Sequence, residues 1–405
     1  MNDVAEDDRA EIATAADRSG SLPLRSWRFP LATWASVWAL LVVTQFVGRS
    51  TNDQSTQFVW SRFFDGWNAF DGPEYLSIAA RGYTYRQLVW FPVYPHLIRV
   101  VALVLHNRLL AGVLISTIAG AIAACLAWTW LGHRCPNPRA HRAAFLGILL
   151  YPYGWYLYGV VYSDALFLAL VLGAFVLIDR DRLLAAGLVG AVATATRPTG
   201  IAIILALFVA GLVRRQVIEP GAGPTWAIDL ELPLRFRRER WRPRDLAPLL
   251  SAVGLLAYMT YLWVDWGSPV RYITVQELYH DADWRTLMKM EYFAQWSGPF
   301  DGRYLASATA QAVLVVLALL CTTAVGRRYG WGAGVLTGSI AVIPALTVGV
   351  FIGSGRYLMA AFPFAAFVGE WVGRRPPLVR GLAVAIAVGV LMVMSFGYSR
   401  GWYLS

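Results

Sequence analysis

The sequence predicts an all-α polytopic membrane protein, because three of its features agree. Of the 405 residues, 57% are hydrophobic and only 15% are charged, whereas about a quarter of the residues of a soluble domain are charged. Long apolar runs recur along the chain, and several approach the roughly 20 residues that cross a bilayer as a helix. The net charge of +10 is concentrated between these runs, as in the cytoplasmic loops of membrane proteins. Nucleic acid is therefore not an expected partner, whereas membrane lipids are.

Eleven apolar runs are expected to form spanning helices, although several are shorter than a full crossing. They cover residues 29–48, 108–131, 142–157, 164–178, 183–197, 199–213, 246–265, 304–325, 331–350, 356–372 and 378–396. A further run, 91–105, contains Arg99 and has two prolines near its start. We expect a re-entrant or interfacial helix here instead of a twelfth span, because a full crossing would move most of the arginine-rich loops outside.

The arginine-rich loops predict which helix ends face the cytoplasm. If the run 91–105 does not cross, all of these loops fall on the side of the N-terminal tail, and they are residues 133–142, 179–182, 214–244, 326–328 and 373–380. If it crosses, most of them move outside and the bias reverses. Because Lys and Arg favour the cytoplasmic side, we expect a multi-pass protein of the cell membrane with its tail inside.

This assignment divides the chain into four parts. Residues 1–28 are expected to be a disordered cytoplasmic tail, and residues 29–213 an N-terminal transmembrane module with a first outer loop at 49–90. Residues 214–245 form a basic cytoplasmic loop, which suits an anionic leaflet. Residues 246–405 form a C-terminal transmembrane module with an outer loop at 266–303, for which we expect extracytoplasmic helices.

The polar motifs of the chain collect on the outer side in this topology. The most unusual is FDGPEYLSIAARGY, residues 70–83, in the first outer loop. From spacing alone it is a helix start, with Asp71 as N-cap, Pro73 in the first turn and Glu74 as the partner in a capping box. From its chemistry, Asp71 is a candidate general base, because a carboxylate at the membrane surface can take a proton from an incoming hydroxyl. Asp65 is the alternative base.

The other outer motifs contain one acid, two arginines and several tyrosines. Asp164 in YSDALF is either part of a helix start, a polar contact to a sugar or a support for the base. Arg197 in TRPTG and Arg356 in SGRY are either interface anchors or cations for a lipid phosphate, since arginine matches phosphate oxygens in a bidentate manner. Tyr94 and Tyr357 belong either to the aromatic belt or to the site.

These motifs resemble those of the class V phosphatidylinositol-glycan mannosyltransferases, a family of the GT-C superfamily. FDGPEYLSIAARGY followed by WFPVYP resembles W-D-x-x-[YF]-x-x-I-A-x-x-G-Y … F-F-P-x-[YF]-P, and YSDALF is similar to Y-S-E-A-L-F. ATRPTG, DWGSPVRYITVQ and SGRYLMAAFP resemble later motifs of the family, and the matches keep their order from residue 65 to 364. The resemblance implies a GT-C-like bundle, which the eleven expected spans and the re-entrant or interfacial helix would form.

The resemblance also implies a reaction, namely inverting transfer of a sugar, usually mannose, from a polyprenyl-phosphate donor to a lipid-linked or envelope glycan acceptor. Asp71 then matches the expected general base, and no metal or cofactor is needed. Three positions depart from the family pattern: Phe70 replaces a tryptophan, Asp164 replaces a glutamate, and Ser268 stands where the family has an acid. We expect substrate contacts from Glu74, Tyr75, Tyr94, Asp164, Arg197, Arg356 and Tyr357.

The residues alone leave two other functions open. A glycolipid transporter or flippase would place charge pairs at membrane depth, which the apolar runs do not contain. An inactive scaffold for envelope assembly would keep the spans but tolerate loss of Asp71. A metal centre is not expected, because the five histidines and three cysteines show neither HxxxH nor CxxC spacing.

Overall fold

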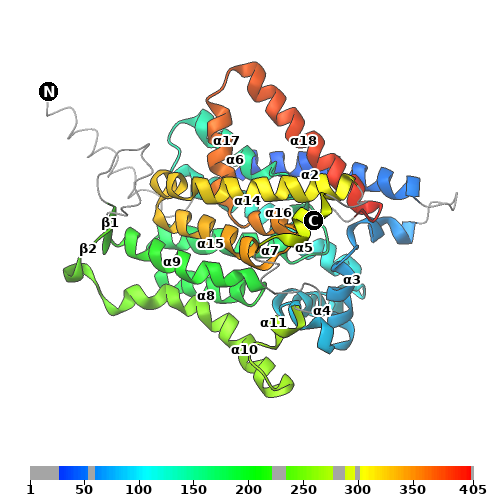
Figure 1. Ribbon diagram of the computed structural model, residues 1–405, viewed down its shortest axis with the longest axis horizontal. Helices are drawn as coiled ribbons and strands as arrows, with labels where there is room; N and C mark the ends of the chain where they lie inside the picture. The colour runs from blue at the N-terminus through cyan, green and yellow to red at the C-terminus, as the bar shows by residue number, and fades with distance from the viewer. Residues whose placement is uncertain (1–26, 53–59, 221–233, 277–287, 297–301, 403–405) are drawn as a thin grey trace.

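The computed structural model describes residues 27–52, 60–220, 234–276, 288–296 and 302–402 (Figure 1). The described residues are almost entirely helical, so the predicted all-α class is confirmed. The one pair of strands in these ranges is a short antiparallel ribbon, β1 (Ile218–Pro220) and β2 (Leu234–Phe236), within the basic loop. The expected tail, apart from residues 27 and 28, lies outside the described residues, as do parts of all three loops.

The helices follow the predicted runs in order. The N-terminal half contains α2 (Arg28–Asn52), α3 (Gly72–Arg81), α4 (Val93–Leu105), α5 (Arg108–Gly132), α6 (Pro138–Leu149), α7 (Asp164–Asp179), α8 (Leu183–Thr194) and α9 (Ile201–Arg214). The C-terminal half contains α10 (Ala252–Trp266), α11 (Arg271–Gln276), α13 (Met290–Gln295), α14 (Gly302–Tyr329), α15 (Trp331–Thr347), α16 (Ser354–Leu358), α17 (Phe362–Gly373) and α18 (Pro377–Ser399).

Five helical segments of the described chain are long and apolar enough to cross a membrane. They are α2, α5, α14, α18 and the continuous stretch Pro243–Trp266, which joins the 3₁₀ segment η7 (Pro243–Ser251) to α10. This observation supports the expected membrane protein. The remaining apolar helices are shorter, and α4 with 13 residues is only about 20 Å long at 1.5 Å per residue.

Two runs that were expected to be continuous spans are broken. In the run 142–157, α6 ends at Leu149 and the chain turns through a segment containing Pro152 before the short 3₁₀ helix η4 (Gly154–Leu157). In the run 356–372, α16 ends at Leu358 and α17 begins at Phe362, with Pro363 in its first turn. Proline disfavours a helical conformation in the residue before it and cannot donate the helical hydrogen bond. Both runs therefore contain shorter helices than the hydrophobic pattern predicted.

Close backbone packing holds the bundle together. Helices α14, α15, α9 and α8 run side by side, with α5 and α7 behind them (Figure 1). A Cβ on Gly147 of α6 would collide with the Ala365 carbonyl of α17, and one on Gly369 would collide with the Ala143 carbonyl. Small residues at such crossings let helices approach closely in a membrane, where burial of apolar surface no longer drives association.

Ion pairs mark two opposite ends of the bundle. Helix α7 shows this directly, because its first residue is Asp164 and its last is Asp179. At the Asp179 end the pairs are Arg134 with Asp179, Arg328 with Glu370, and Arg215 with Asp181 and Asp245. At the Asp164 end they are Asp164 with Arg197 and Asp71 with Arg356.

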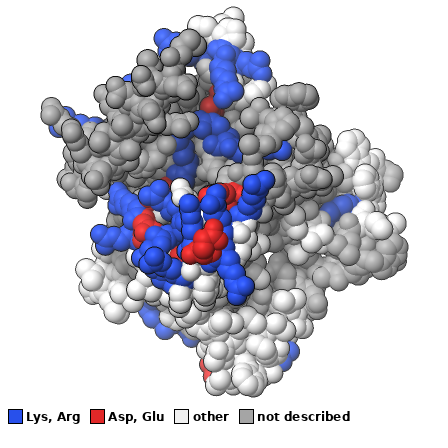
Figure 2. All heavy atoms as spheres, turned by 90° about the vertical axis from the view of Figure 1, so that its left-hand side faces the viewer, with Lys and Arg blue, Asp and Glu red and all other residues white. Residues whose placement is uncertain are grey.

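The strands β1 and β2 lie on the left of Figure 1, and Figure 2 shows basic side chains gathered on this face.

Candidate functional site

The start of α3 presents Asp71 at the end of the bundle opposite the basic face. The residue before it, Phe70, has φ 54°, a left-handed conformation that is rare for bulky side chains and is found where a site constrains the backbone. Asp71 occupies the N-cap position, but its carboxylate makes no capping hydrogen bond. Its Oδ2 instead accepts a hydrogen bond from Arg356 Nη1 at 2.8 Å. The predicted capping box is therefore absent, because the Asp71 carboxylate is hydrogen-bonded to Arg356 instead of to the backbone of α3.

Glu74 does not complete the capping box either. Its Oε2 accepts a hydrogen bond of 2.7 Å from Gln87 Nε2, in the 3₁₀ helix η3 (Tyr85–Val89) that follows α3. The other end of α3 is held by Arg99 of α4, which donates to the carbonyls of Ile78 and Ala79. A cation at a helix C-terminus is favoured by the helix dipole, and this contact explains why an arginine stands in the apolar run 91–105. Helix α3 is thus fixed at both ends.

Arg356 faces Asp71 from the short helix α16. The backbone there passes close to a neighbouring aromatic ring, since any side chain on Gly355 would overlap the ring of Tyr153. The Arg356 guanidinium lies 5.0 Å from the ring centroid of Tyr162 and 5.6 Å from that of Tyr357, distances at which a cation is attracted to the ring face. Its Nε, and Ser354 Oγ two residues earlier, are buried without hydrogen-bond partners among the described residues. Leaving such buried polar groups unpaired is costly.

A second ion pair, Arg197 with Asp164, lies beside the first. The two side chains are 8% and 2% exposed, so Arg197 is not the snorkelling anchor that its position at a helix end allowed. Its guanidinium lies 5.6 Å from the ring of Tyr357, the same ring that Arg356 approaches. Asp164 also attracts the Arg356 guanidinium. Two acids and two arginines therefore form one neutral cluster around Tyr357.

Tyr75 and Tyr94 lie on the inner side of this cluster. The Tyr75 hydroxyl shares a 3.0 Å hydrogen bond with Ser163 Oγ, so Ser163, at the N-cap of α7, binds a tyrosine instead of capping the helix. Burial raises the pKa of the Tyr75 phenol, and the nearby Arg197 offsets only part of this rise. Tyr75 is therefore a neutral hydrogen-bonding group. Tyr94 is fully buried, and its hydroxyl is bonded to Ser116 and to the Gly112 carbonyl, so it supports Tyr75 from below.

Two tyrosines that were not among the expected site residues also build the site. The Tyr162 hydroxyl accepts a hydrogen bond of 2.9 Å from the Asp71 backbone N–H. Tyr398, near the end of α18, is bonded through its hydroxyl to both the N–H and the carbonyl of Ala69. Tyr162 stood inside the YSDALF motif and could have been found there, whereas Tyr398 carried no signal beyond being an aromatic residue near a helix end.

The structure brings six of the eight expected residues into one cluster and leaves two outside it. Asp71, Tyr75, Asp164, Arg197, Arg356 and Tyr357 are joined by the contacts above, Tyr94 lies beneath them, and Glu74 binds Gln87 one turn along α3. The alternative base, Asp65, faces Arg49 at 4.0 Å instead of Arg356. Among the described residues no three His, Cys, Asp or Glu side chains are grouped so that they could hold a metal ion.

Comparison with known proteins adds no assignment. No protein-family model matches this sequence, and no curated protein matches it. The argument for a function therefore rests on the residues and their geometry.

Proposed function

We propose that the protein is an integral-membrane inverting glycosyltransferase, most simply a mannosyltransferase, which moves a sugar from a polyprenyl-phosphate donor to a lipid-linked or envelope glycan acceptor. The observation that supports this best is the pair of Asp71 and Arg356. A carboxylate that is 29% exposed lies against a guanidinium that is 13% exposed, at the end of the bundle opposite the basic loops. The same small site thus offers a proton acceptor and a cation for phosphate.

Asp71 acts as the general base in this proposal. Its free carboxylate oxygen accepts the proton of the acceptor hydroxyl as that oxygen forms the new bond to the anomeric carbon. The bond from this carbon to the phosphate oxygen breaks, and its electron pair leaves with the polyprenyl phosphate. A positioned base contributes about 10²–10⁴-fold to such a reaction. Displacement from the opposite face inverts the configuration at the anomeric carbon.

Arg356 binds the departing phosphate. Fixed cations that face the developing charge stabilise a transition state strongly, because they need no reorganisation during the reaction. The base and the phosphate must lie on opposite faces of the sugar, so the contact between Asp71 and Arg356 has to open when the donor binds. The donor phosphate can drive this opening, since it replaces one anionic partner of the arginine with another.

Replacing Arg356 with alanine is expected to impair donor use more than acceptor use. A charge-assisted hydrogen bond contributes about 1.5–3 kcal/mol, which corresponds to about 10- to 150-fold in kcat/KM for the donor. Lysine at this position should restore only part of the activity, because it lacks the planar fork of arginine. The measurement is initial rates with varied radiolabelled polyprenyl-phosphate mannose at a fixed concentration of total membrane lipids as acceptor. Wild-type donor kinetics in Arg356→Ala would place the phosphate elsewhere, with Arg81, Arg271 and Arg303 as the next candidates.

The proposal includes a topology of about eleven spans with the site on the extracytoplasmic face. One observation supports it: basic side chains gather on one face of the molecule (Figure 2). The shorter helices, such as α8 with 12 residues, cross only together with the segments that flank them.

Single cysteines in a variant without Cys125, Cys135 and Cys321 are expected to label from opposite sides of the membrane. A cysteine at Ala140, in the first turn of α6, should react with an impermeant maleimide only after the cells are opened, because its neighbours Arg139 and Arg142 favour the cytoplasm. Cysteines at Thr84 or Ser268 should react in intact cells. Labelling of Ala140→Cys in intact cells would show that α4 crosses the membrane completely.

A glycolipid transporter or flippase and an inactive assembly scaffold are the alternatives. The central parts of α5, α14 and α15 contain no charged residue, whereas transport pathways are commonly lined by ionisable groups at membrane depth. The scaffold is distinguished by experiment, because its function would survive loss of Asp71. The most direct test of the enzyme is transfer of radiolabel from polyprenyl-phosphate mannose to total membrane lipids by the purified protein.

A further inference from the structure

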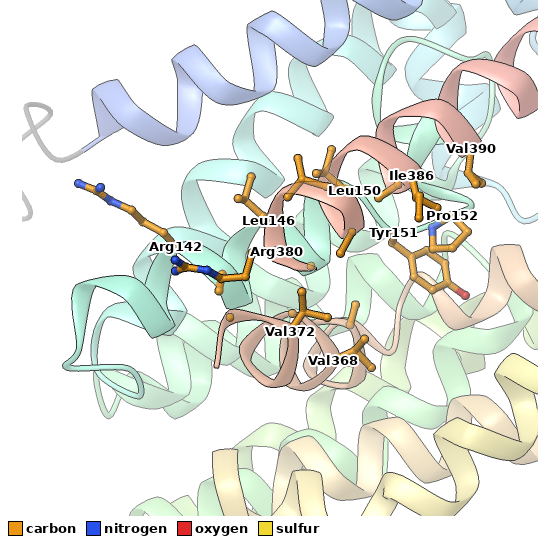
Figure 3. A pocket seen from close by; sticks show the side chains of 18 of the residues that line it. Arg142, Leu146, Leu150, Tyr151, Pro152, Val368, Val372, Arg380, Ile386 and Val390 are labelled. Carbon is orange, nitrogen blue, oxygen red and sulfur yellow. The ribbon is translucent and has the colours of Figure 1, made fainter. Parts of the chain in front are cut away.

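A groove of about 920 Å³ lies between α18 and the pair of helices α6 and α17. Figure 3 shows Arg142 and Arg380 toward one end of this groove and Tyr151 and Pro152 toward the other. Leu314 and Leu317 of α14 contribute to its lining. Apart from Tyr151 and the arginines, every lining residue is apolar or glycine. The groove is therefore an apolar trough with a basic end.

The packing of the three helices explains why the trough is open. Glycines bring α6 and α17 into backbone contact, as described above, so these two helices form one continuous surface. Helix α18 stands apart from them, and a Cβ on its Gly381 would meet no atom within 4 Å. The lining side chains Leu317, Val368 and Ile386 are 44%, 41% and 65% exposed within the described chain. An apolar molecule can therefore lie against all three walls.

The charges at the basic end are unbalanced. Three arginines line the groove, Arg139 and Arg142 from α6 and Arg380 from α18, and no aspartate or glutamate does. None of the three has a carboxylate partner among the described residues. By contrast, Arg134 and Arg328 at the same end of the bundle are both paired with acids. The groove thus leaves positive charge available to an anionic ligand.

We propose that this groove binds one anionic phospholipid, with its phosphate on the three arginines and its acyl chains along α18. Arginine matches phosphate oxygens in a bidentate manner. From Pro377 to Val390, α18 rises about 20 Å at 1.5 Å per residue, which exceeds the roughly 15 Å of hydrocarbon in one leaflet. The arginine end coincides with the basic face of the bundle, so the lipid comes from the cytoplasmic leaflet, where anionic lipids attract Lys and Arg. Phosphatidylcholine is disfavoured by comparison, because its choline group would place another positive charge beside the arginines, where no acidic residue of the described chain lines the groove.

The inner end of the groove lies beneath the proposed catalytic site without overlapping it. The Tyr151 hydroxyl donates a hydrogen bond of 2.9 Å to the carbonyl of Gly355, the residue before Arg356. Acyl chains in the groove therefore pack against a residue that supports α16. The lipid site is independent of the proposed reaction, because none of its lining residues belongs to the cluster around Asp71.

The test measures selective retention of a defined lipid by the purified protein. Native mass spectrometry would count lipids bound after titration with palmitoyl-oleoyl phosphatidylglycerol, and in parallel with phosphatidylcholine that carries the same chains. We expect one phosphatidylglycerol to bind more tightly than phosphatidylcholine. The double variant Arg142→Gln/Arg380→Gln should weaken this binding about 30-fold, since each arginine near an anionic lipid raises the binding affinity about fivefold. The matched control is Arg180→Gln/Arg182→Gln, which removes two exposed arginines of the α7–α8 loop at the same end of the bundle.

A third variant separates shape from charge. Val384→Trp fills the groove from α18 and keeps all three arginines, so it should displace the lipid while Arg180→Gln/Arg182→Gln does not. Equal retention of the two lipids by the wild-type protein would overturn the proposal, because the groove would then hold any acyl chain. Equal losses in the two double variants would also overturn it, because the attraction would then be a diffuse property of the basic face. Undiminished binding in Val384→Trp would place the lipid outside the groove.

Discussion

Replacing Asp71 with asparagine is expected to lower sugar transfer by about 100-fold or more, and to leave folding and membrane insertion near normal. Asparagine has the shape of aspartate and keeps an oxygen that can accept the hydrogen bond from Arg356 Nη1, which now binds Asp71 Oδ2 at 2.8 Å. It cannot accept the proton of the acceptor hydroxyl, and a positioned base contributes about 10²–10⁴-fold. The measurement is the rate of transfer from radiolabelled polyprenyl-phosphate mannose to membrane lipids, together with the yield of protein in the membrane.

Asp65→Asn is the matched control for this prediction. Asp65 also lies in the first outer loop and also faces an arginine, but its partner is Arg49 at 4.0 Å and its side chain is 36% exposed. This variant should retain near wild-type transfer, because an exposed ion pair of this kind contributes little. If Asp65→Asn is inactive while Asp71→Asn transfers at the wild-type rate, the general base is Asp65. If both variants are fully active, the protein is not using either acid as its base.

Replacing Arg197 with methionine is expected to destabilise the protein by about 3–5 kcal/mol, which is the usual cost of breaking a buried ion pair. The reason is that Asp164, 2% exposed, would be left as a buried carboxylate without its cation. Methionine keeps most of the length and apolar contact of the arginine stem, so the loss reports on charge more than on packing. The measurement is reversible unfolding of the purified protein in detergent, with the free energy extrapolated to zero denaturant.

The double variant Asp164→Leu/Arg197→Met tests the cause of this loss. With both charges removed, the stability should return to within about 1–2 kcal/mol of wild type, because apolar residues of similar volume often replace a buried ion pair without loss. If Arg197→Met alone is as stable as wild type, Asp164 has another cation, and Arg356, which it also attracts, is the candidate. A stable double variant that has lost sugar transfer would show that the pair serves the reaction as well as the fold.

The pairing of Arg197 with Asp164 also changes what is expected of the two arginines. Both were candidates to bind the donor phosphate, and the sequence offered no reason to prefer either. Arg197 is buried and paired with Asp164. Arg356 is more exposed and has a buried Nε without a partner among the described residues. Arg356 is therefore the stronger candidate for the phosphate, and Arg197 for a structural role beside it.

The sequence by itself determined the class of protein and the charged residues of the cluster around Tyr357. Composition and apolar runs suffice for an all-α membrane protein, because the bilayer forces the backbone of each span to satisfy its own hydrogen bonds. The motifs around Asp71, Asp164, Arg197 and Arg356 stood out because charges next to apolar runs are costly and need a local reason. Even so, prolines at 152 and 363 broke two helices that the hydrophobic pattern had joined.

Only the tertiary structure decided how these residues are paired. Asp71 could have capped α3, and that local solution fits its spacing, but Arg356 lies 285 residues away in sequence and takes its carboxylate. Likewise, the close crossing of α6 and α17 and the separation of α18 create a lipid-sized groove that no single run of sequence contains. The physical reason is the same in both cases. Local patterns describe what each helix offers to its surroundings, whereas the partner of a charge or the wall of a groove depends on which helices pack together.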